Sequence, residues 1–203
     1  MYIDYMKKLP LHLENPVDNS IYYIIEKIEK QVYLIGLTPN MLTTIGNIFT
    51  IIFVYLFLNK KYILASFAFF MSYFFDCLDG YIARSYNMVS IFGDFYDHIS
   101  DFTKLLVTAY LLISRVKMNK NSLILSLITV IISFFTLLFF CNQEIYYGIP
   151  ESSPTLSLLT CFERSNKTKS EAIESLKYYR FFGCGTITLY CAIIIGAFKY
   201  LSK

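Results

Sequence analysis

Apolar residues are gathered in five long runs, at residues 41–58, 62–76, 97–114, 122–141 and 181–201. Short polar segments separate the first four runs, and the stretch 115–121 is basic. Runs of this kind are typical of helices that cross a membrane. The pattern therefore predicts an all-α, polytopic membrane helix bundle with five clear spans.

The second and third runs are short once their acidic ends are set aside. Their apolar parts, 62–75 and 102–114, fall below the roughly 20 residues that a full span requires. We therefore expect both helices to continue through their acidic ends, which would line a polar cavity at the membrane surface. Charged groups inside a membrane protein usually face such a cavity and mark a functional site.

The segment before the first run predicts two further elements. Residues 1–19 are polar and interrupted by Pro10 and Pro16, which indicates a loose cytosolic lead whose residues 18–20 can cap a helix. Residues 21–34 are amphipathic and too charged to cross a bilayer, so an interfacial helix fits best. Packing of this helix against the bundle is the alternative. We accordingly divide the chain into 1–37, the lead and interfacial helix, and 38–203, the membrane domain.

Composition supports an integral membrane protein and argues against other classes. The chain has 203 residues, of which 56% are hydrophobic, and its mean hydropathy is +0.49. A net charge of +3 gives no reason to expect a nucleic-acid partner. The five cysteines are odd in number and lack a framework spacing, so a disulfide scaffold is not expected. The mixed polar and apolar N-terminal region does not resemble a cleavable signal peptide.

The stretch 76–101 carries the candidate chemistry. Asp76 and Asp79 are three residues apart, and Asp97 and Asp101 are four apart, so each pair lies on one helix face. Two helices joined by a tight link would aim both pairs at one cleft. Four carboxylates in a low-dielectric bundle repel one another unless a cation compensates them. Carboxylate oxygens suit Mg²⁺ or Mn²⁺, and no Cys or His cluster has the spacing of a zinc site.

Two glycines and an arginine accompany these acids. Gly80 and Gly93 would let a ligand or a neighbouring backbone approach where a Cβ would block it. Arg84 supplies a planar, permanently charged group of the kind that holds phosphate. Acids for a pair of metal ions, a glycine gap and an arginine together suggest phosphoryl-group transfer.

These residues resemble the signature of the CDP-alcohol phosphatidyltransferase family. The pattern Asp76-x2-Asp79-Gly80-x2-Ala83-Arg84-x8-Gly93-x3-Asp97-x3-Asp101 agrees with that signature position for position. The resemblance implies a metal-dependent transferase of phospholipid biosynthesis. In such enzymes an alcohol attacks a CDP-linked alcohol at the phosphate next to the transferred group, and CMP is released.

The resemblance also implies roles for individual residues. Asp76, Asp79 and Asp97 would bind one of two Mg²⁺ or Mn²⁺ ions, and Asp76, Asp97 and Asp101 the other. Asp101 would in addition be the catalytic general base. The positions that correspond to the family's substrate-binding residues are Asn40, Met41, Leu42, Thr43, Gly80, Arg84 and Ser90.

Three further polar residues near the signature are given other roles. Asp94 is expected to be solvated or to cap a helix. His98 projects from a different face than Asp97 and is expected to donate or accept a hydrogen bond rather than bind metal. For Lys104 we favour a side chain that extends to the membrane interface over one that binds an acceptor phosphate.

The family's usual core has six membrane helices, and the chain departs from this in the polar segment 142–180. A re-entrant or interfacial piece, a partner chain in a homodimer, or a cytosolic extension of the last helix over 171–180 would each account for the difference. With the site on the cytosolic face, the inner segments hold ten Lys and Arg residues against seven outside, which favours that orientation.

The leading hypothesis is transfer of a phosphatidyl group from CDP-diacylglycerol to a small polar alcohol. An aminoalcohol phosphotransferase, which uses CDP-choline or CDP-ethanolamine and diacylglycerol, is the alternative. A non-catalytic membrane channel or scaffold is the hypothesis from another class. The partners expected for the leading hypothesis are a CDP-linked lipid donor, an alcohol acceptor and membrane lipids, and the residues do not identify the acceptor.

Overall fold

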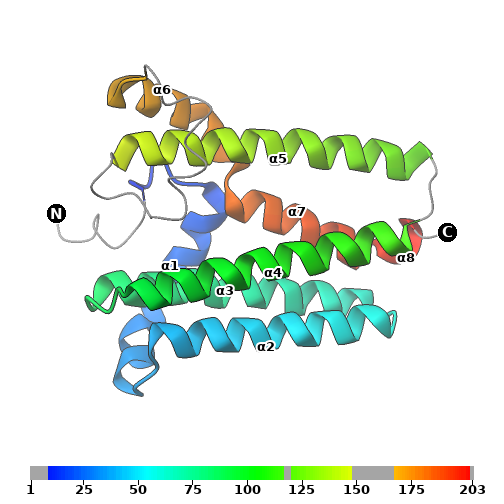
Figure 1. Ribbon diagram of the computed structural model, residues 1–203, viewed down its shortest axis with the longest axis horizontal. Helices are drawn as coiled ribbons and strands as arrows, with labels where there is room; N and C mark the ends of the chain where they lie inside the picture. The colour runs from blue at the N-terminus through cyan, green and yellow to red at the C-terminus, as the bar shows by residue number, and fades with distance from the viewer. Residues whose placement is uncertain (1–8, 117–119, 148–166, 202–203) are drawn as a thin grey trace.

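The computed structural model describes residues 9–116, 120–147 and 167–201, and within these ranges every regular element is a helix. The helix α2 (Pro39–Leu58) packs against both α3 (Tyr62–Ser85) and α4 (Ile91–Arg115), and α7 (Cys184–Gly196) packs on α3. The helix α5 (Lys120–Tyr147) lies on the far side of α7 (Figure 1). The all-α membrane bundle predicted from the sequence is confirmed.

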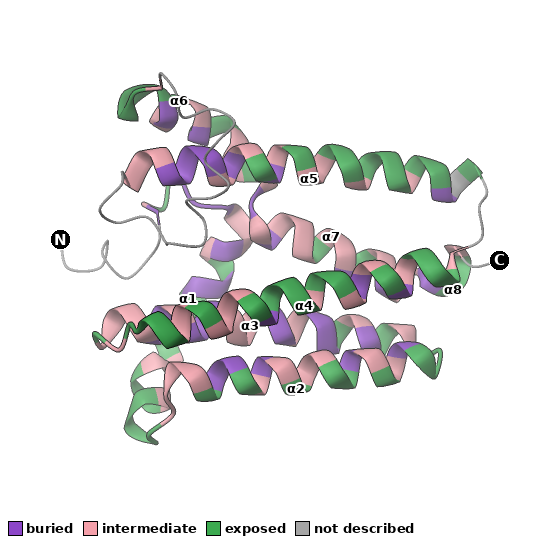
Figure 2. Ribbon diagram, in the orientation of Figure 1, coloured by how far each residue is buried: buried purple, intermediate pink, exposed green. Residues whose placement is uncertain are grey.

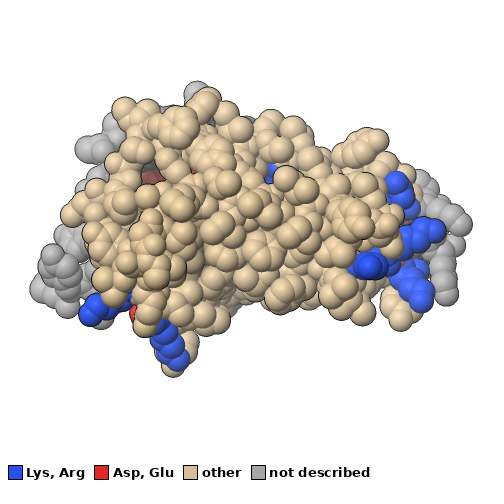
Figure 3. Space-filling view, turned by 90° about the horizontal axis from the view of Figure 1, so that it is seen from below, with Lys and Arg blue, Asp and Glu red and all other residues tan. Residues whose placement is uncertain are grey.

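Four segments are long and apolar enough to cross a membrane: Pro39–Leu58, Tyr62–Ser85, Ser122–Tyr147 and Lys169–Gly196. The helix α4 is also long, at 25 residues, but its first half carries the acids of the predicted site. The face shown in Figure 3 agrees with a membrane location, because most of its Lys and Arg side chains lie toward the two ends and the band between them is nearly uncharged. These features describe an integral membrane protein.

The apolar surface of α5 faces outward along most of the helix (Figure 2). Val130, Ile131 and Phe134 are more than half exposed, as expected for side chains that meet lipid rather than protein. The C-terminal end of α5 differs, because Asn142, Gln143 and Glu144 are buried there. The predicted end of this helix at residue 141 is therefore wrong. The polar residues that suggested it are covered by protein, and the helix continues to Tyr147.

The connection between α1 (Pro16–Leu34) and α2 is a short turn that ends in a capped helix start. Gly36 has φ +79°, a conformation that glycine adopts without steric cost. Thr38 caps α2 through its side chain, which accepts a hydrogen bond from the N–H of Met41, and Pro39 takes the first helical position.

Both α3 and α4 continue through their acidic ends, as predicted. At 1.5 Å per residue the 24 residues of α3 extend about 36 Å, enough to cross the apolar core of a bilayer. Ser90 caps α4, because its Oγ accepts a hydrogen bond from the N–H of Gly93. The acids thus lie on regular helix near the end of each span.

The start of α1 is a correction to the sequence prediction. The helix begins at Pro16 and not near residue 21, because the side chain of Asn15 accepts hydrogen bonds from the N–H groups of Val17 and Asp18. Asn15 is therefore the cap, and the predicted cap at 18–20 is wrong. Pro16 takes the first helical position, where its missing N–H costs nothing.

Residues 9–15 are also not the loose lead that was predicted. Leu9 and Leu13 are buried in a cluster with Phe139 of α5 and Leu176 of α6 (Lys169–Tyr179). The prolines suggested a loose segment, but Leu9 and Leu13 pack in an apolar cluster with helices that are distant in sequence. Residues 1–8 of the predicted lead lie outside the described part of the chain.

The apolar face of α1 packs on the bundle, which is the alternative kept open for this helix. Ile21, Tyr22 and Ile25 share a buried cluster with Tyr73 and Leu78 of α3. Its opposite face keeps Tyr23 and Ile24 at least half exposed. The placement of that face at the membrane interface stays a prediction.

The predicted last helix, 181–201, is divided into several pieces. The helix α6 (Lys169–Tyr179) is followed by a 3₁₀ turn (Arg180–Phe182), α7 and the short α8 (Phe198–Leu201). Thr168 and Glu171 form a capping box that starts α6, and Gly183 in extended conformation separates the turn from α7. Of the polar segment 142–180, residues 148–166 lie outside the described residues.

Candidate active site

The centre of the site is a group of three carboxylates from two helices. Asp76 comes from α3, and Asp97 and Asp101 come from successive turns of α4. One ligand oxygen of each lies within 4.8 Å of the others. Asp76 and Asp97 are partly buried, whereas Asp101 is exposed. The predicted convergence of these acids across one cleft is therefore observed for three of the four.

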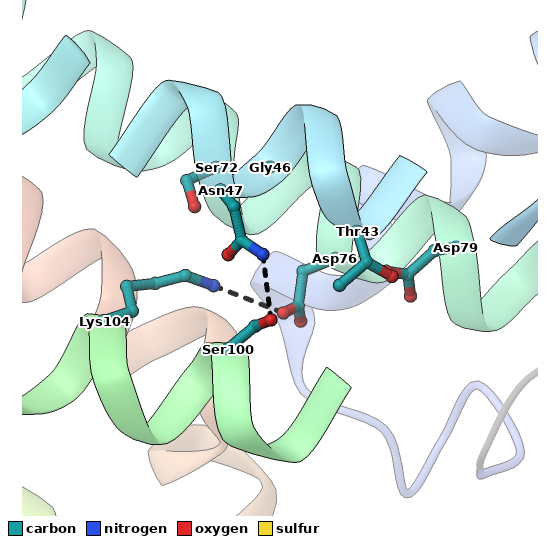
Figure 4. A pocket seen from close by; sticks show the side chains of 8 residues that line it. All are labelled: Thr43, Gly46, Asn47, Ser72, Asp76, Asp79, Ser100 and Lys104. Atoms are coloured by element: carbon teal, nitrogen blue, oxygen red, sulfur yellow. Dashed lines mark hydrogen bonds and ion pairs between the residues drawn. The ribbon is translucent and has the colours of Figure 1, made fainter. Parts of the chain in front are cut away.

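The fourth acid, Asp79, faces helix α2 instead. Its Oδ2 accepts a 2.5 Å hydrogen bond from the hydroxyl of Thr43, and the residue is buried. Asp79 and Asp76 nevertheless line the same small cavity, of about 10 Å³, between α2, α3 and α4 (Figure 4). Asp79 is thus a neighbour of the three-acid group and not a member of it.

Lys104 lies inside the site, so the prediction that it extends to the membrane interface is wrong. Its Nζ is 2.9 Å from Asp101 Oδ1 and 3.2 Å from Asp76 Oδ1. The side chain comes from α4, one turn beyond Asp101, and reaches across to α3 (Figure 4). In a poorly hydrated cavity, the attraction between the Lys104 ammonium group and two carboxylates outweighs the hydration that the ammonium group would gain at the surface.

A row of polar residues on α2 lies along the cavity, and of these only Thr43 was predicted from the sequence, as a substrate-binding residue. Thr43, Thr44, Asn47 and Thr50 recur at helical spacing within an apolar span, which is the signal that could have revealed the others. Their side chains pair with groups on α3 and α4; the pairs are Thr43 with Asp79, Thr44 and Asn47 with Tyr96, Asn47 with Ser100, and Thr50 with Ser72.

These hydrogen bonds fix α4 beside α2. The amide nitrogen of Asn47 donates to Ser100 Oγ at 2.9 Å, immediately before Asp101 (Figure 4). On the other side, Gly46 lets α2 approach α3, because a Cβ there would lie 3.2 Å from the Ser72 carbonyl oxygen. The backbone positions of the acids are therefore set by contacts with α2.

The two glycines of the signature lie beside residues predicted to bind substrate. A Cβ on Gly80 would lie 3.1 Å from Nη1 of Arg84, so the glycine leaves room for the guanidinium group. A Cβ on Gly93 would lie 3.0 Å from Ser90 Oγ and 3.1 Å from Asn40 Oδ1. Asn40 and Ser90 thus both lie beside Gly93, at the N-terminal ends of α2 and α4.

Met41 and Leu42, predicted from the same stretch, lie in different surroundings. Met41 is 47% exposed, while Leu42 is fully buried in the apolar cluster of α1, α2 and α3. The side chain of Leu42 therefore packs in the core, and only its backbone is left for a ligand.

Asp94 and His98 form a local pair one turn apart on α4. The Nδ1 atom of His98 lies 2.7 Å from the Asp94 carbonyl oxygen and 3.6 Å from its Oδ1. Asp94 lies in the first turn of the helix, where a negative charge is favourable. His98 makes the expected kind of hydrogen bond and is not among the three clustered acids.

The three-acid group fits a hard divalent cation. It offers carboxylate oxygens from two rigid helices, which is the donor chemistry that Mg²⁺ and Mn²⁺ prefer. With all three ionised, the two carboxylates that Lys104 contacts and the neighbouring Asp97 would place three negative charges against one ammonium group. Additional positive charge at this position would therefore be stabilising.

Fold and site together define a membrane-embedded helix bundle with a carboxylate cluster between α3 and α4 and, further along α3, an arginine of the kind that holds phosphate. The sequence profile of the CDP-alcohol phosphatidyltransferase family matches residues 36–197. The chain therefore belongs to the CDP-alcohol phosphatidyltransferase family.

A relative from Pyrococcus horikoshii, described as an archaetidylinositol phosphate synthase, is 40% identical over 77 residues. This similarity covers 38% of the chain and 41% of the relative, so the chain spans less than half the length of that protein. No solved structure matches the chain.

Proposed function

We propose that this protein transfers a phosphatidyl-type group from a CDP-linked lipid to a small polar alcohol, with release of CMP. The observation that carries the proposal is the meeting of Asp76, Asp97 and Asp101 within 4.8 Å at the end of a membrane bundle. Family membership supports this chemistry over a channel or scaffold, because neither of those needs acids in this pattern. The name of the relative supports a phosphatidyl-type transfer over an aminoalcohol transfer.

Four acids of the signature are proposed to hold two divalent ions. Asp76, Asp79 and Asp97 would hold one, and Asp76, Asp97 and Asp101 the other. When bound, such a pair of ions neutralises the pyrophosphate charge and stabilises the departing oxygen of CMP. Asp79 Oδ2 accepts a hydrogen bond from the Thr43 hydroxyl in this structure. The proposal therefore requires that Asp79 give up this hydrogen bond when it binds the ion.

Asp101 is proposed to be the general base. It is the exposed member of the three acids, so an acceptor alcohol can reach it. The hydroxyl oxygen attacks the phosphorus next to the transferred lipid alcohol while its proton passes to the Asp101 carboxylate. The bond from that phosphorus to the CMP oxygen breaks, and CMP leaves with the bonding electrons.

The donor is proposed to bind along the start of α2 and the end of α3. Arg84 would pair with a phosphate oxygen, and Gly80 would leave room for the diphosphate beside it. Asn40 and Ser90, which flank Gly93, would contact the nucleotide together with the exposed Met41, Thr43 and the backbone of Leu42.

The donor class and acceptor can be identified with one experiment. Purified protein is supplied with CDP-diacylglycerol and a panel of alcohols that includes inositol phosphate, glycerol phosphate and serine, and CMP and the lipid products are measured. We expect CMP release that requires Mg²⁺ or Mn²⁺ and a new phospholipid with one of the alcohols. Full turnover in excess chelator would contradict the metal assignment.

A parallel reaction separates the two transferase classes. It supplies CDP-choline or CDP-ethanolamine with diacylglycerol, and product formed only there would contradict the proposed donor. The cytosolic position of the site and a homodimer stay predictions. Labelling of single cysteines at the two ends of the bundle in intact cells tests the first, and the mass of the detergent-solubilised complex tests the second.

A further inference from the structure

Lys104 has no part in the proposed reaction, yet it occupies the centre of the site. Its side chain is only 13% exposed, and its Nζ contacts Asp76 and Asp101 at 3.2 and 2.9 Å. Lysines near the ends of membrane helices ordinarily extend toward the headgroups. Lys104 is instead directed inward, which indicates a specific interaction with the two carboxylates.

The Lys104 ammonium group donates hydrogen bonds to the carboxylate oxygens of Asp76 and Asp101 that a metal ion would use. Mg²⁺ binds carboxylate oxygens at about 2.0–2.1 Å, so an ion on the same two oxygens would come very close to Nζ. Two positive centres at such a separation repel strongly even at the effective dielectric constant of a protein surface. Lys104 in this position and an ion on these oxygens therefore exclude each other.

The structure also allows Lys104 to leave. Its charge is carried on a flexible stem of four carbon atoms, so Nζ can move without a shift of α4. The cavity beside it is lined by polar groups, among them Asn47, Ser72 and Ser100 (Figure 4). A displaced ammonium group would thus remain in polar surroundings.

We propose that Lys104 is a tethered counter-cation, which holds Asp76 and Asp101 in position before metal binds and is displaced by one of the divalent ions. The inference rests on the proposed metal site and assigns a positioning role to a residue outside the family signature. It has two consequences. The ion at Asp76 and Asp101 binds more weakly than the site's acids alone would dictate, and the metal-free protein is stabilised by the lysine.

Binding of Mn²⁺ alone tests the proposal without reference to turnover. We would titrate the detergent-solubilised protein with Mn²⁺ and follow the free ion by electron paramagnetic resonance, for the wild type and the Lys104→Met and Lys104→Arg variants. The control is Lys61→Met, which removes an exposed lysine at the opposite end of α3. The melting temperature of each protein is measured in chelator.

Removal of the ammonium group should raise the affinity of the weaker Mn²⁺ site by at least about tenfold, because the ion no longer displaces a charge. The same variant should melt at a lower temperature than the wild type in chelator. Lys104→Arg keeps the charge and should resemble the wild type in both measurements, as should Lys61→Met. If Lys104→Met does not fold, Lys104→Gln gives the same comparison with a polar side chain.

The outcomes separate this inference from the proposed function. Unchanged or weaker Mn²⁺ binding in the folded Met or Gln variant, with normal binding by the wild type, would overturn the role of Lys104 alone. Absence of Mn²⁺ binding by every protein would overturn this role and the metal site together. Binding by the variant but not by the wild type would support displacement in its strongest form.

Discussion

The hydroxyl of Thr43 on α2 donates a 2.5 Å hydrogen bond to Oδ2 of Asp79 on α3. Both residues are buried, and they are 36 positions apart in the sequence. The contact joins the start of the first span to the first acidic pair. The Asp79 carboxylate is therefore directed toward α2 and not toward the three clustered acids of α3 and α4. Thr43 thus helps to determine the orientation of the Asp79 side chain.

Thr43→Val should destabilise the protein, because it leaves the buried Asp79 carboxylate without its hydroxyl donor at nearly unchanged volume. A loss of roughly 1–3 kcal/mol is typical for an unsatisfied buried polar group. Thermal unfolding in one detergent measures the effect. Thr43→Ser keeps the hydroxyl and is the control, so equal losses in the two variants would show that the hydrogen bond is not the cause.

Substitution of Asp101 and of Asp76 should have different consequences. Asp101→Asn keeps an oxygen of the same shape but removes the base, so turnover should fall by about 10²–10⁴-fold while donor binding is only weakened. Asp76→Asn should lose donor binding and turnover together, since this residue is assigned to both ions. Calorimetric titration with the CDP donor alongside CMP release distinguishes the two. Near-normal turnover by Asp101→Asn would show that the proton goes elsewhere.

Gly80→Ala should weaken donor binding while leaving the fold intact. The added Cβ would lie 3.1 Å from Nη1 of Arg84, and the end of that flexible side chain can move where a backbone could not. Alanine is also the better helix former by about 0.5–1 kcal/mol, so the melting temperature should not fall. Gly196→Ala, on α7, is a matched control whose nearest contact is 3.4 Å from Ser66 Cβ. Equal donor affinity in all three proteins would limit Gly80 to a packing role.

Gly185→Ala should destabilise the protein strongly, again relative to Gly196→Ala. Gly185 lies where α1 crosses the start of α7. An added Cβ would clash with Asp18 Oδ1 and lie 2.8 Å from Val17 Cβ. It would also disturb the 3.3 Å hydrogen bond from the Gly185 N–H to Asp18 Oδ2. We expect a loss of about 1–3 kcal/mol, as is usual for overpacking in a core. Thermal unfolding measures it, and an unchanged melting temperature would mean that α1 is not firmly packed on α7.

Local pattern was sufficient to predict the helical spans and the acidic pairs. Hydrophobic runs determine which segments suit a bilayer, and spacings of three and four residues determine which acids share a helix face. The start of α2 at Thr38 and Pro39, after Gly36, is likewise a local feature, because caps depend on neighbouring residues only. The extension of α3 through Asp76 and Asp79 followed from span length.

The remaining features depend on which residues of different helices face one another, and spacing within one helix carries no such information. Asn15 is the cap of α1 and also donates to the Arg180 carbonyl oxygen, 165 positions away. From the sequence alone, Lys104 resembles a typical interfacial lysine. Only the packing of α3 shows that Asp76 lies 3.2 Å from its Nζ. The sequence determined that four acids lie on two helix faces. Only tertiary packing decided that three of them meet, that Thr43 binds the fourth, and that a lysine lies among them, because these contacts are made across helices.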